Sequence, residues 1–400
     1  MAVPPIAALE IGTSRTVVCV GEMAQGDRVR ILGFGHSETR GVRKGQIIDL
    51  DQARMGVERA VRQAETMSKV NVKQVLLAIS GGHILSQSNP GRLTIRRSDR
   101  AVQQEDIEVV NEIARDIPIE SDRQVLHTIN QSYTLDGQSG IVKPEGIRCN
   151  MLTLNTLSIH GLKNRIDNAV DVARSVNLDV TDVTFSGLCA SMSTLTPEQK
   201  KMGVVLVDLG GGTTNYVAFA GDILVAAGSL AVGGDHVTND IALAFGLSLT
   251  RADEIKRKEG SAVIEGDSAN QRITVPPEQT EREERQFSRR ALNTVINARV
   301  DETFRVLRTI LDEAGVLPHL GAGVVLTGGG AYLRRIKDQA QHVFGLPCRI
   351  GTPDNVDGLE ADQPASFATA AGLLMYGQIT YEDTSLLAPV RNFFKRMSKS

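Results

Sequence analysis

The chain has 400 residues, 41% of them hydrophobic and 23% charged, and its formal net charge is -3. This length is enough to bury a large core and predicts two or three domains. Because a general nucleic-acid binder would usually show a basic domain, the acidic balance argues against nucleic acid as a partner.

The cysteines and the first residues of the chain indicate the cellular compartment in which the protein is expected. Cys19, Cys149, Cys189 and Cys348 lie far apart, without a CxxC pair or a nearby histidine pair. This favours reduced thiols over disulfides or a metal site. The opening MAVPPIAALEIG lacks the basic segment of a signal peptide, and no apolar run reaches the ~18 residues that span a bilayer. We therefore expect a cytoplasmic protein that meets a membrane only from its surface.

Two similar segments, about half a chain apart, organise the sequence. Residues 7–22 read AALEIGTSRTVVCVGE, and residues 204–222 read VVLVDLGGGTTNYVAFAGD. In both, an apolar strand is followed by an acid, a turn of small residues that contains glycine, and a second β-branched strand. We therefore predict two related lobes, each of which opens with the same hairpin.

Mixed α/β patterning continues the first lobe. Apolar residues recur at helical spacing over 49–67, and residues 72–81 are typical of a buried strand. Residues 83–160 form a predicted insert, in which an amphipathic helix is followed by a pair of strands. A helix over 162–176 then returns the chain to the main architecture.

The second lobe follows the same plan. Residues 236–310 form a second predicted insert, which ends in a long helix. Residues 323–344 predict a strand, a glycine turn and a helix, and residues 364–377 form the last packed element. The predicted domains are lobe one at 1–82 and 161–197 with its insert at 83–160, lobe two at 198–235 and 311–378 with its insert at 236–310, a linker at 379–388 and a terminal helix at 389–400.

The turns that contain glycine are the predicted ligand-binding elements. A turn of small residues exposes consecutive backbone N–H groups that can wrap a phosphate chain, and glycine lets the phosphate approach closely. Glu10 and Asp208, at the start of the two hairpin turns, would hold Mg²⁺ through water. A third turn, Gly328 to Gly330, suits a nucleoside. The three turns together predict a nucleotide site, and the lack of GxxxxGK[ST] excludes a P-loop protein.

These motifs resemble those of the actin, Hsp70 and sugar-kinase superfamily. LEIGTSR matches its first phosphate motif, VDLGGGTTN the second and VLTGGGAYL the adenosine motif, with connecting helices at FSGLCASMSTL and ASFATAAGLLMYG. Within the superfamily the chain is most similar to the FtsA family of bacterial cell-division proteins. That similarity covers nearly the whole chain and includes ISGGHI, EIARDIPIESDRQVLHTINQSYTLDGQSGI, RADEIKRKEG and INARVDE.

The resemblance implies an α/β, actin-like ATPase fold: two lobes with a mixed five-stranded sheet each, an inserted subdomain in each lobe and a C-terminal amphipathic helix. It also implies binding of ATP and Mg²⁺ and polymerisation into actin-like filaments on the inner face of the cytoplasmic membrane. Members of the family tether the tubulin-like protein FtsZ there and relay to downstream membrane proteins of the divisome.

The family's site residues carry over by motif. The implied nucleotide-binding residues are Gly12, Thr13, Ser14, Arg15, Gly210, Gly211, Gly212, Thr213, Thr214, Gly234, Asp253, Lys256, Gly328, Gly329 and Gly330. Asp253 stands where the family usually has Glu. In the second insert, where the family docks the C-terminal peptide of FtsZ, the matching residues are Arg285, Arg299 and Glu302, and two arginines suit an acidic peptide.

Two positions in the sequence bear on whether bound ATP is hydrolysed. Many actin-like ATPases place a carboxylate or glutamine in the first connecting segment to orient the attacking water. Here Ser186 occupies that position, and Asn215 stands where the second phosphate motif often has Asp. We assign no catalytic residue and expect slow turnover, with ATP mainly a structural ligand for polymerisation.

The chain closes on VRNFFKRMSKS. At helical spacing one apolar face is formed by Leu387, Val390, Phe393, Phe394 and Met397, and the basic residues are Arg391, Lys395, Arg396 and Lys399. Spacing alone leaves a helix packed on its own core and an interfacial membrane helix equally open. The polar link before the tail and the family resemblance favour an interfacial helix that binds an anionic membrane.

The energetics of such a tail predict weak anchoring. Its apolar side chains contribute on the order of 4–6 kcal/mol and each basic residue ~1 kcal/mol, while ordering the tail costs ~2–5 kcal/mol. One tail would bind reversibly, whereas a filament that carries many tails would bind much more tightly.

Three other functions are weaker interpretations. A small-molecule kinase or phosphatase of the superfamily needs a catalytic acid, and none is convincing here. An Hsp70-type chaperone needs a substrate-binding domain after the last lobe. An actin-like adaptor of pilus assembly would also act as a tether, but such adaptors lack the QSYTLDGQSGI segment that is present here.

Overall fold

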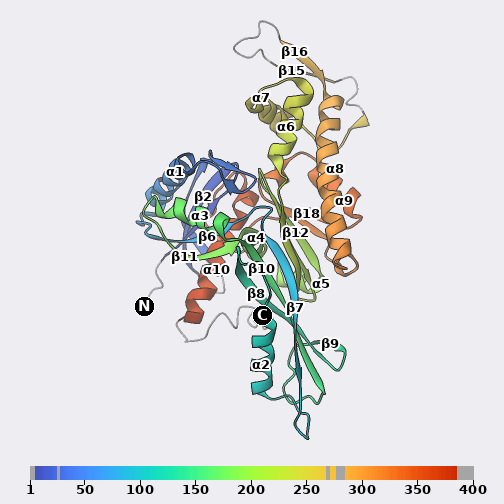
Figure 1. Ribbon diagram of the computed structural model, residues 1–400. Coiled ribbons are helices and arrows are strands. Elements are labelled where there is room, and N and C mark those ends of the chain that lie inside the picture. The colour runs from blue at the N-terminus through green and yellow to red at the C-terminus, as the bar shows by residue number, and fades with distance from the viewer. Residues whose placement is uncertain (1–4, 25–27, 267–270, 276–283, 385–400) are drawn as a thin grey trace.

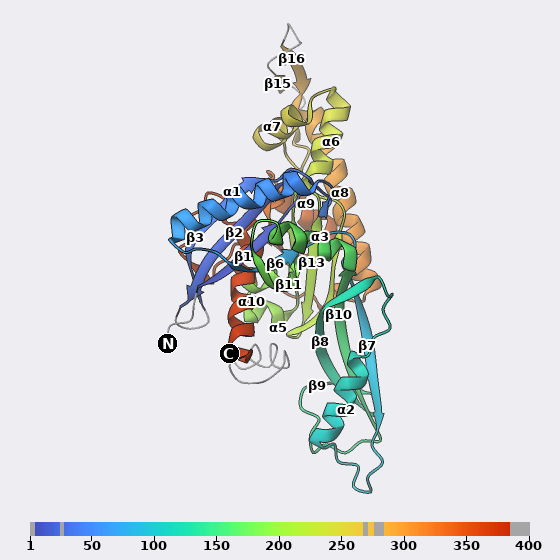
Figure 2. The same ribbon diagram turned by 60° about the vertical axis from the view of Figure 1, so that its left-hand side comes forward.

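The computed structural model describes residues 5–24, 28–266, 271–275 and 284–384. Two α/β lobes lie side by side, and the two inserts lie at opposite ends of the molecule (Figure 1). The inserts remain at opposite ends when the view is turned by 60° (Figure 2). The predicted plan of two lobes with one insert each is therefore confirmed.

Lobe one is built on a mixed sheet with the strand order β11-β6-β1-β2-β3-β19. Its strands are β1 (Ile6–Ile11), β2 (Arg15–Met23), β3 (Val29–Glu38), β6 (Gln74–Ile79), β11 (Asp179–Phe185) and β19 (Val356–Asp357). The first three strands form an antiparallel meander, and β6 and β11 extend it in parallel. The six strands exceed the predicted five, because the short β19 returns from far along the chain and pairs with β3.

Both faces of this sheet are covered. Its helices are α1 (Leu50–Ser68), α3 (Lys163–Arg174), α4 (Ser186–Thr194) and α10 (Ala368–Thr384), and a small hairpin of β4 (Val42–Arg43) and β5 (Gln46–Ile47) precedes α1. Neighbouring residues on a strand point to opposite faces. Leu9 and Leu77 accordingly share a core with α1 and α3, while Ala8 and Leu76 share another with α10.

The first insert is a four-stranded antiparallel sheet covered by one helix. It contains β7 (Leu85–Thr94), α2 (Gln104–Arg115), β8 (Arg123–Leu135), β9 (Gln138–Ile141) and β10 (Met151–Leu162), with the strand order β7-β10-β8-β9. α2 buries Val110 and Ala114 against Leu152 and Leu154 of the sheet, as its amphipathic spacing predicts. The insert thus has a small core of its own.

Lobe two has a five-stranded sheet, as predicted, with the order β14-β13-β12-β17-β18. It contains α5 (Pro197–Met202), β12 (Val204–Leu209), β13 (Thr214–Ala220), β14 (Ile223–Leu230), β17 (Val324–Thr327), α9 (Ile336–Phe344) and β18 (Cys348–Ile350), with 3-10 turns η2 (Leu317–His319), η3 (Gly329–Tyr332) and η4 (Pro364–Phe367). The strands β12 and β13 form the second hairpin of the duplication.

The second insert contains α6 (Gly234–Phe245), α7 (Leu249–Glu259), the strand pair β15 (Arg272–Val275) and β16 (Arg285–Ser288), and the first part of α8 (Arg289–Glu313). The predicted bounds of 236–310 are slightly wrong at both ends. α6 begins two residues earlier, at Gly234, and α8 continues past residue 310, because its later residues Leu307 and Leu311 belong to the core of lobe two.

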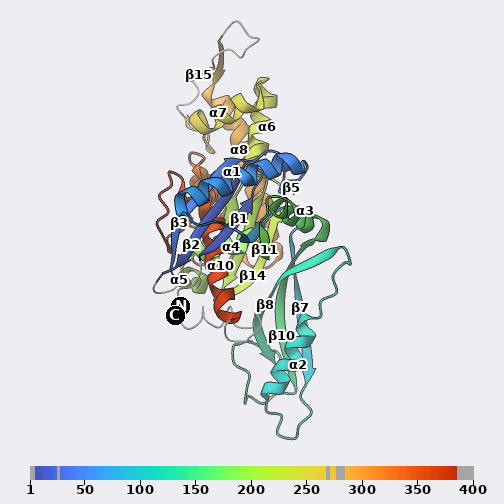
Figure 3. The same cartoon turned by 90° about the vertical axis from the view of Figure 1, so that its left-hand side faces the viewer.

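The assignment of residues up to 378 to lobe two is wrong for their last part. α10 packs on the sheet of lobe one (Figure 3). Its Leu373 and Leu374 are fully buried beside Val17 and Cys19. β19 also pairs with lobe one. The chain crosses back because α10 completes, with α4, the cover over the apolar face of β1, β2 and β6, and position in the chain does not reveal this.

The predicted linker is also shorter than expected. α10 continues to Thr384, so residues 379–384 are helical. The predicted terminal helix at 389–400 lies outside the described residues. Within the described residues, no helix is long and apolar enough to cross a membrane.

A small residue allows α10 to approach α4 closely. A Cβ on Gly372 would overlap the carbonyl oxygen of Cys189 on α4, so the backbones of the two helices are in contact there. The side chain of Ser193 also donates a 2.7 Å hydrogen bond to the carbonyl oxygen of Ala368. The contact requires glycine at position 372.

We predict that Gly372→Ala lowers the free energy of unfolding by about 1–3 kcal/mol, because the added methyl group overpacks this contact. Gly56→Ala in α1 is the matched control, since a Cβ there would meet its nearest neighbour at 3.5 Å, an ordinary contact. The control should raise the free energy of unfolding by no more than about 1 kcal/mol, because alanine favours a helix more than glycine does. Chemical denaturation of both variants measures the difference, and equal stability would contradict the proposed tight contact.

Candidate nucleotide site

The tips of the two duplicated hairpins have the same backbone geometry. In the first, β1 pairs with β2 as far as Ile11 opposite Thr16, and Gly12 N–H donates to the Arg15 carbonyl at 3.1 Å. In the second, Leu209 lies opposite Thr214, and Gly210 N–H donates to the Thr213 carbonyl at 2.9 Å. The predicted duplication is therefore present in the three-dimensional structure.

The two tips face each other across the lobes at very short range. A Cβ on Gly211 would lie 2.7 Å from the Cβ of Ser14, and a Cβ on Gly212 would lie 2.5 Å from Thr13 Oγ1. Thr13 Oγ1 also accepts a 2.9 Å hydrogen bond from Gly45 N–H. The tips leave no room for side chains on the second hairpin, which is the geometry that a cradle of backbone N–H groups needs.

The second tip rests on the beginning of α6. Gly234 N–H donates to the Gly210 carbonyl at 3.0 Å, and Asp235 N–H donates to the Gly211 carbonyl at 2.8 Å. The helix start is therefore held directly behind the glycine turn, where the N-terminal end of a helix favours an anion.

Lys256 and Asp253 lie beside this helix start. Lys256 Nζ donates to Thr238 Oγ1 at 2.7 Å and to the Gly234 carbonyl at 3.2 Å, and it forms an ion pair with Asp253 at 2.6 Å. Neighbouring cations and hydrogen bonds lower the pKa of Asp253 despite the opposing effect of burial. The structure thus brings together Gly234, Lys256 and Asp253, three of the residues that the resemblance implies for the nucleotide.

The third turn lies against the second hairpin. Gly328 has φ of 81°, and a Cβ there would overlap Asp208 Oδ1, so both its conformation and its surroundings require glycine. Gly330 is similarly close to Leu209. A Cβ on Gly329, by contrast, would meet no atom of the described chain within 4 Å, which leaves this residue open to a ligand.

Two acids meet where the three turns converge. Burial of the Glu10 carboxyl group, with the charge of Asp208 as the second cause, raises the pKa of Glu10 to about 8. Burial also raises the pKa of Asp208, against the effect of a 3.0 Å hydrogen bond from Asn215 Nδ2. Two carboxyl groups that disfavour each other's ionisation suit a divalent cation, and an all-oxygen donor set suits Mg²⁺.

The side chain of Arg15 does not join the other predicted phosphate residues. Its guanidinium group donates a 2.7 Å hydrogen bond to the Ser366 carbonyl and lies over the Phe367 ring at 4.8 Å. Arg15 shares the face of β2 with Val17, which α10 covers, so the side chain is directed toward that cover. The structure thus places this side chain against Ser366 and Phe367, while its carbonyl closes the first turn, and the expected contact of Arg15 with the phosphates stays a prediction.

Sequence reasoning missed Thr369, whose side chain hydrogen-bonds Glu10 and lowers the pKa of that carboxyl group. It also missed Ser80, whose Oγ lies 3.4 Å from Thr213 Oγ1. Thr369 lies in the connecting segment ASFATAAGLLMYG and Ser80 in ISGGHI, but neither motif marks these single residues as neighbours of the glycine turns.

The three predicted partner residues gather around α6 in the second insert. Arg299 on α8 forms an ion pair with Asp240 at 2.6 Å and another with Glu302 at 2.5 Å. Arg285 donates to the carbonyl oxygens of Gly246 and Phe245, at the end of α6. Both arginines therefore bind the same helix, one near its middle and one at its end.

Comparisons with known proteins agree with the motifs. A family model described as cell division protein FtsA matches residues 205–372, and one described as SHS2 domain inserted in FTSA matches residues 81–160. Cell division protein FtsA of Escherichia coli strain K12 is 34% identical over 98% of this chain and 96% of its own length. The FtsA of Pseudomonas aeruginosa is also 34% identical, over 93% of this chain and 89% of its own.

Solved structures show the same fold at low identity. A PilM-PilN type IV pilus biogenesis complex has a TM-score of 0.65 at 17% identity and covers 93% of this chain and 98% of its own. MreB5 of Spiroplasma citri bound to AMPPNP has a TM-score of 0.57 at 14% identity, with 96% and 99% covered. The actin-like fold expected from the sequence is therefore confirmed.

We predict that Gly212→Ala weakens ATP binding by at least about tenfold, because the Cβ would push the two tips apart and hold the phosphates away from the backbone N–H groups. Gly266→Ala is the control, since a Cβ there would meet no described atom within 4 Å. Isothermal titration calorimetry with ATP and Mg²⁺ measures both variants. Equal affinities for Gly212→Ala and the control would contradict the role of the tips.

Proposed function

The chain belongs to the FtsA family of cell division proteins, and from this premise we propose that it is an ATP-binding actin-like adaptor that attaches FtsZ to the cytoplasmic side of the inner membrane at the division site. The family assignment rests on 34% identity over nearly the full length of both chains. The observation that supports the proposed mechanism best is the contact between the glycine tips of the two lobes.

In the proposed site, backbone N–H groups from Gly12 to Ser14 and from Gly210 to Thr214 hold the terminal phosphates, and the third turn flanks the nucleoside. Glu10 and Asp208 hold Mg²⁺ through water, and the cation neutralises the phosphate charge. Because the phosphate-binding tips come from different lobes, a bound nucleotide ties the lobes together. We propose that this closed form is the one that polymerises.

The structure offers little for hydrolysis. Ser186, at the start of α4, is almost fully buried, and its hydroxyl group is a weak general base. Asn215 cannot accept a proton from water as a carboxylate does. We therefore expect a steady-state phosphate-release rate far below about one per second, under the 1–10³ s⁻¹ that is typical of enzymes. A rate at or above that level would contradict the proposed structural role of ATP.

The second insert offers a surface for an acidic peptide with an apolar anchor. Leu243 of α6 is 75% exposed, three residues after Asp240 and three before Gly246. These spacings place Leu243 on the same side of the helix as the two arginine contacts. We propose that the C-terminal peptide of FtsZ docks here, with Arg285 and Arg299 facing its acidic residues and Glu302 orienting Arg299.

The membrane contact is proposed from sequence, because residues 385–400 lie outside the described structure. Val390, Phe393, Phe394 and Met397 would enter the interface, and the basic residues Arg391, Lys395 and Arg396 would meet anionic lipid. The described chain ends with α10 on lobe one. We further propose that downstream divisome membrane proteins dock on the first insert.

One reconstitution tests the adaptor function. Purified protein, ATP and FtsZ are sedimented with vesicles that contain anionic lipid, and FtsZ in the pellet is measured. We expect the wild-type protein to carry FtsZ down, Phe393→Glu/Phe394→Glu to leave both proteins in solution, and Arg299→Ala to pellet without FtsZ. Arg305→Ala, which removes an exposed arginine paired with Asp301 on the same helix, is the control and should behave as wild type.

The outcomes separate the parts of the proposal. Pelleting of the double glutamate variant at the wild-type level would remove the tail's role. Failure of the wild-type protein to recruit FtsZ would favour an adaptor of another system, such as the pilus-assembly type considered above.

A further inference from the structure

Asn215 has one amide atom that the protein does not satisfy. The residue is 2% exposed, and its Nδ2 donates a 3.0 Å hydrogen bond to Asp208 Oδ2. Its Oδ1 is buried and has no hydrogen-bond partner among the described residues. A buried acceptor without a donor is costly, so it indicates that a donor arrives from elsewhere.

The surroundings of Asn215 show which side of the structure it faces. Asn215 lies directly opposite Asp208 on neighbouring antiparallel strands, so both side chains are on the same face of the sheet. The start of α4 packs over this face, since a Cβ on Gly187 would lie 3.3 Å from the Asn215 Cβ. The amide is therefore held between the acid pair and the first connecting helix.

Asn215 also orients Asp208. One carboxylate oxygen, Oδ2, accepts from the asparagine, while the other, Oδ1, lies where a Cβ on Gly328 would overlap it. The acid is thus directed between the second hairpin and the third turn. The Asp208 carboxyl group beside the Asn215 amide, and the Glu10 carboxyl group whose pKa it raises, supply acceptors, and no donor of the described residues bonds to Asn215 Oδ1.

We propose that Asn215 is a positioning residue for the hydrated divalent cation of the nucleotide site: Nδ2 fixes Asp208, and Oδ1 accepts a hydrogen bond from a water molecule carried by the cation. This inference rests on the proposed nucleotide function. Water bound to Mg²⁺ is a strong donor, and Mg²⁺ keeps several of its waters in such sites. An amide supplies this acceptor without adding a third negative charge to the buried acid pair.

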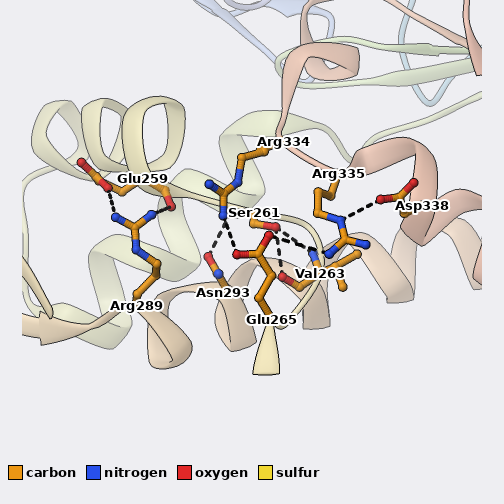
Figure 4. A network of polar contacts seen from close by, with 9 residues as sticks. All are labelled: Glu259, Ser261, Val263, Glu265, Arg289, Asn293, Arg334, Arg335 and Asp338. Carbon is orange, nitrogen blue, oxygen red and sulfur yellow. Dashed lines mark hydrogen bonds and ion pairs between the residues drawn. The ribbon is translucent and has the colours of Figure 1, made fainter. Parts of the chain in front are cut away.

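A second buried asparagine provides a matched comparison. Asn293, on α8, is fully buried, accepts a 3.0 Å hydrogen bond from Ser261 N–H through Oδ1, and has no described partner for Nδ2. Figure 4 shows it within a network that joins the second insert to α9, including ion pairs of Arg334 with Glu265 and of Arg335 with Asp338. Its free atom is a donor and faces no acid pair, so it offers nothing to a hydrated cation.

The test uses calorimetry to measure the affinity for ATP with Mg²⁺ and again with excess EDTA, and the ratio of the two affinities is the Mg²⁺-dependent gain. The proteins compared are the wild type, Asn215→Ala, Asn215→Asp and Asn293→Ala. We expect Asn215→Ala to reduce the Mg²⁺-dependent gain in affinity about tenfold while the affinity in EDTA stays within about twofold. Asn215→Asp keeps an acceptor oxygen but loses the donor to Asp208 and adds a negative charge, so it should restore only part of the gain. Asn293→Ala should lower the melting temperature and leave the gain unchanged.

Each result decides the question. Equal loss of affinity by Asn215→Ala with Mg²⁺ and with EDTA would assign the residue a structural role only, and an unchanged gain would remove its role altogether. If Asn215→Ala does not fold, the Asn215→Asp variant still discriminates, since a Mg²⁺-dependent gain equal to that of the wild type would overturn the role of Nδ2 and complete loss of the gain would overturn the role of the acceptor oxygen. A wild-type affinity that does not respond to Mg²⁺ would contradict the metal site itself, and with it the proposed function.

Discussion

The steric contact between two glycine turns from different lobes is the constraint on which the rest of the structure depends. Gly211 and Gly212 approach Ser14 and Thr13 so closely that a single Cβ would separate them. The backbone of the second turn therefore contacts side chains of the first turn, and backbone N–H groups of both turns lie at this contact. A ligand that binds there contacts two halves of the chain at once. The proposed link between nucleotide and polymer rests on this contact.

A second close approach determines on which lobe the last described helix packs. α10 lies on α4 because Gly372 allows the two backbones to touch, and its leucines complete the core of lobe one. The last described residues consequently belong to the first lobe rather than to the second. The proposed membrane tail therefore starts from the lobe that also bears the first insert.

Electrostatics at the site follow from burial. Glu10 and Asp208 are brought together by the convergence of two hairpins, and burial raises the pKa of both. Arg15 is close enough to lower the pKa of Glu10, but its guanidinium group is held by Ser366 and Phe367. The acid pair is thus only partly neutralised by the protein, which is the state that a bound cation would relieve.

The sequence by itself determined the local elements, the duplicated hairpins, the glycine turns and the family, because strand alternation, helical spacing and turn chemistry act between near neighbours in the chain. Only the tertiary structure decided that α10 and β19 belong to lobe one, that Arg15 meets Ser366 and Phe367, and that Thr369 reaches Glu10. These outcomes depend on which apolar surface remains uncovered after the lobes assemble. Packing between residues hundreds of positions apart decides that, and no periodicity along the chain records it.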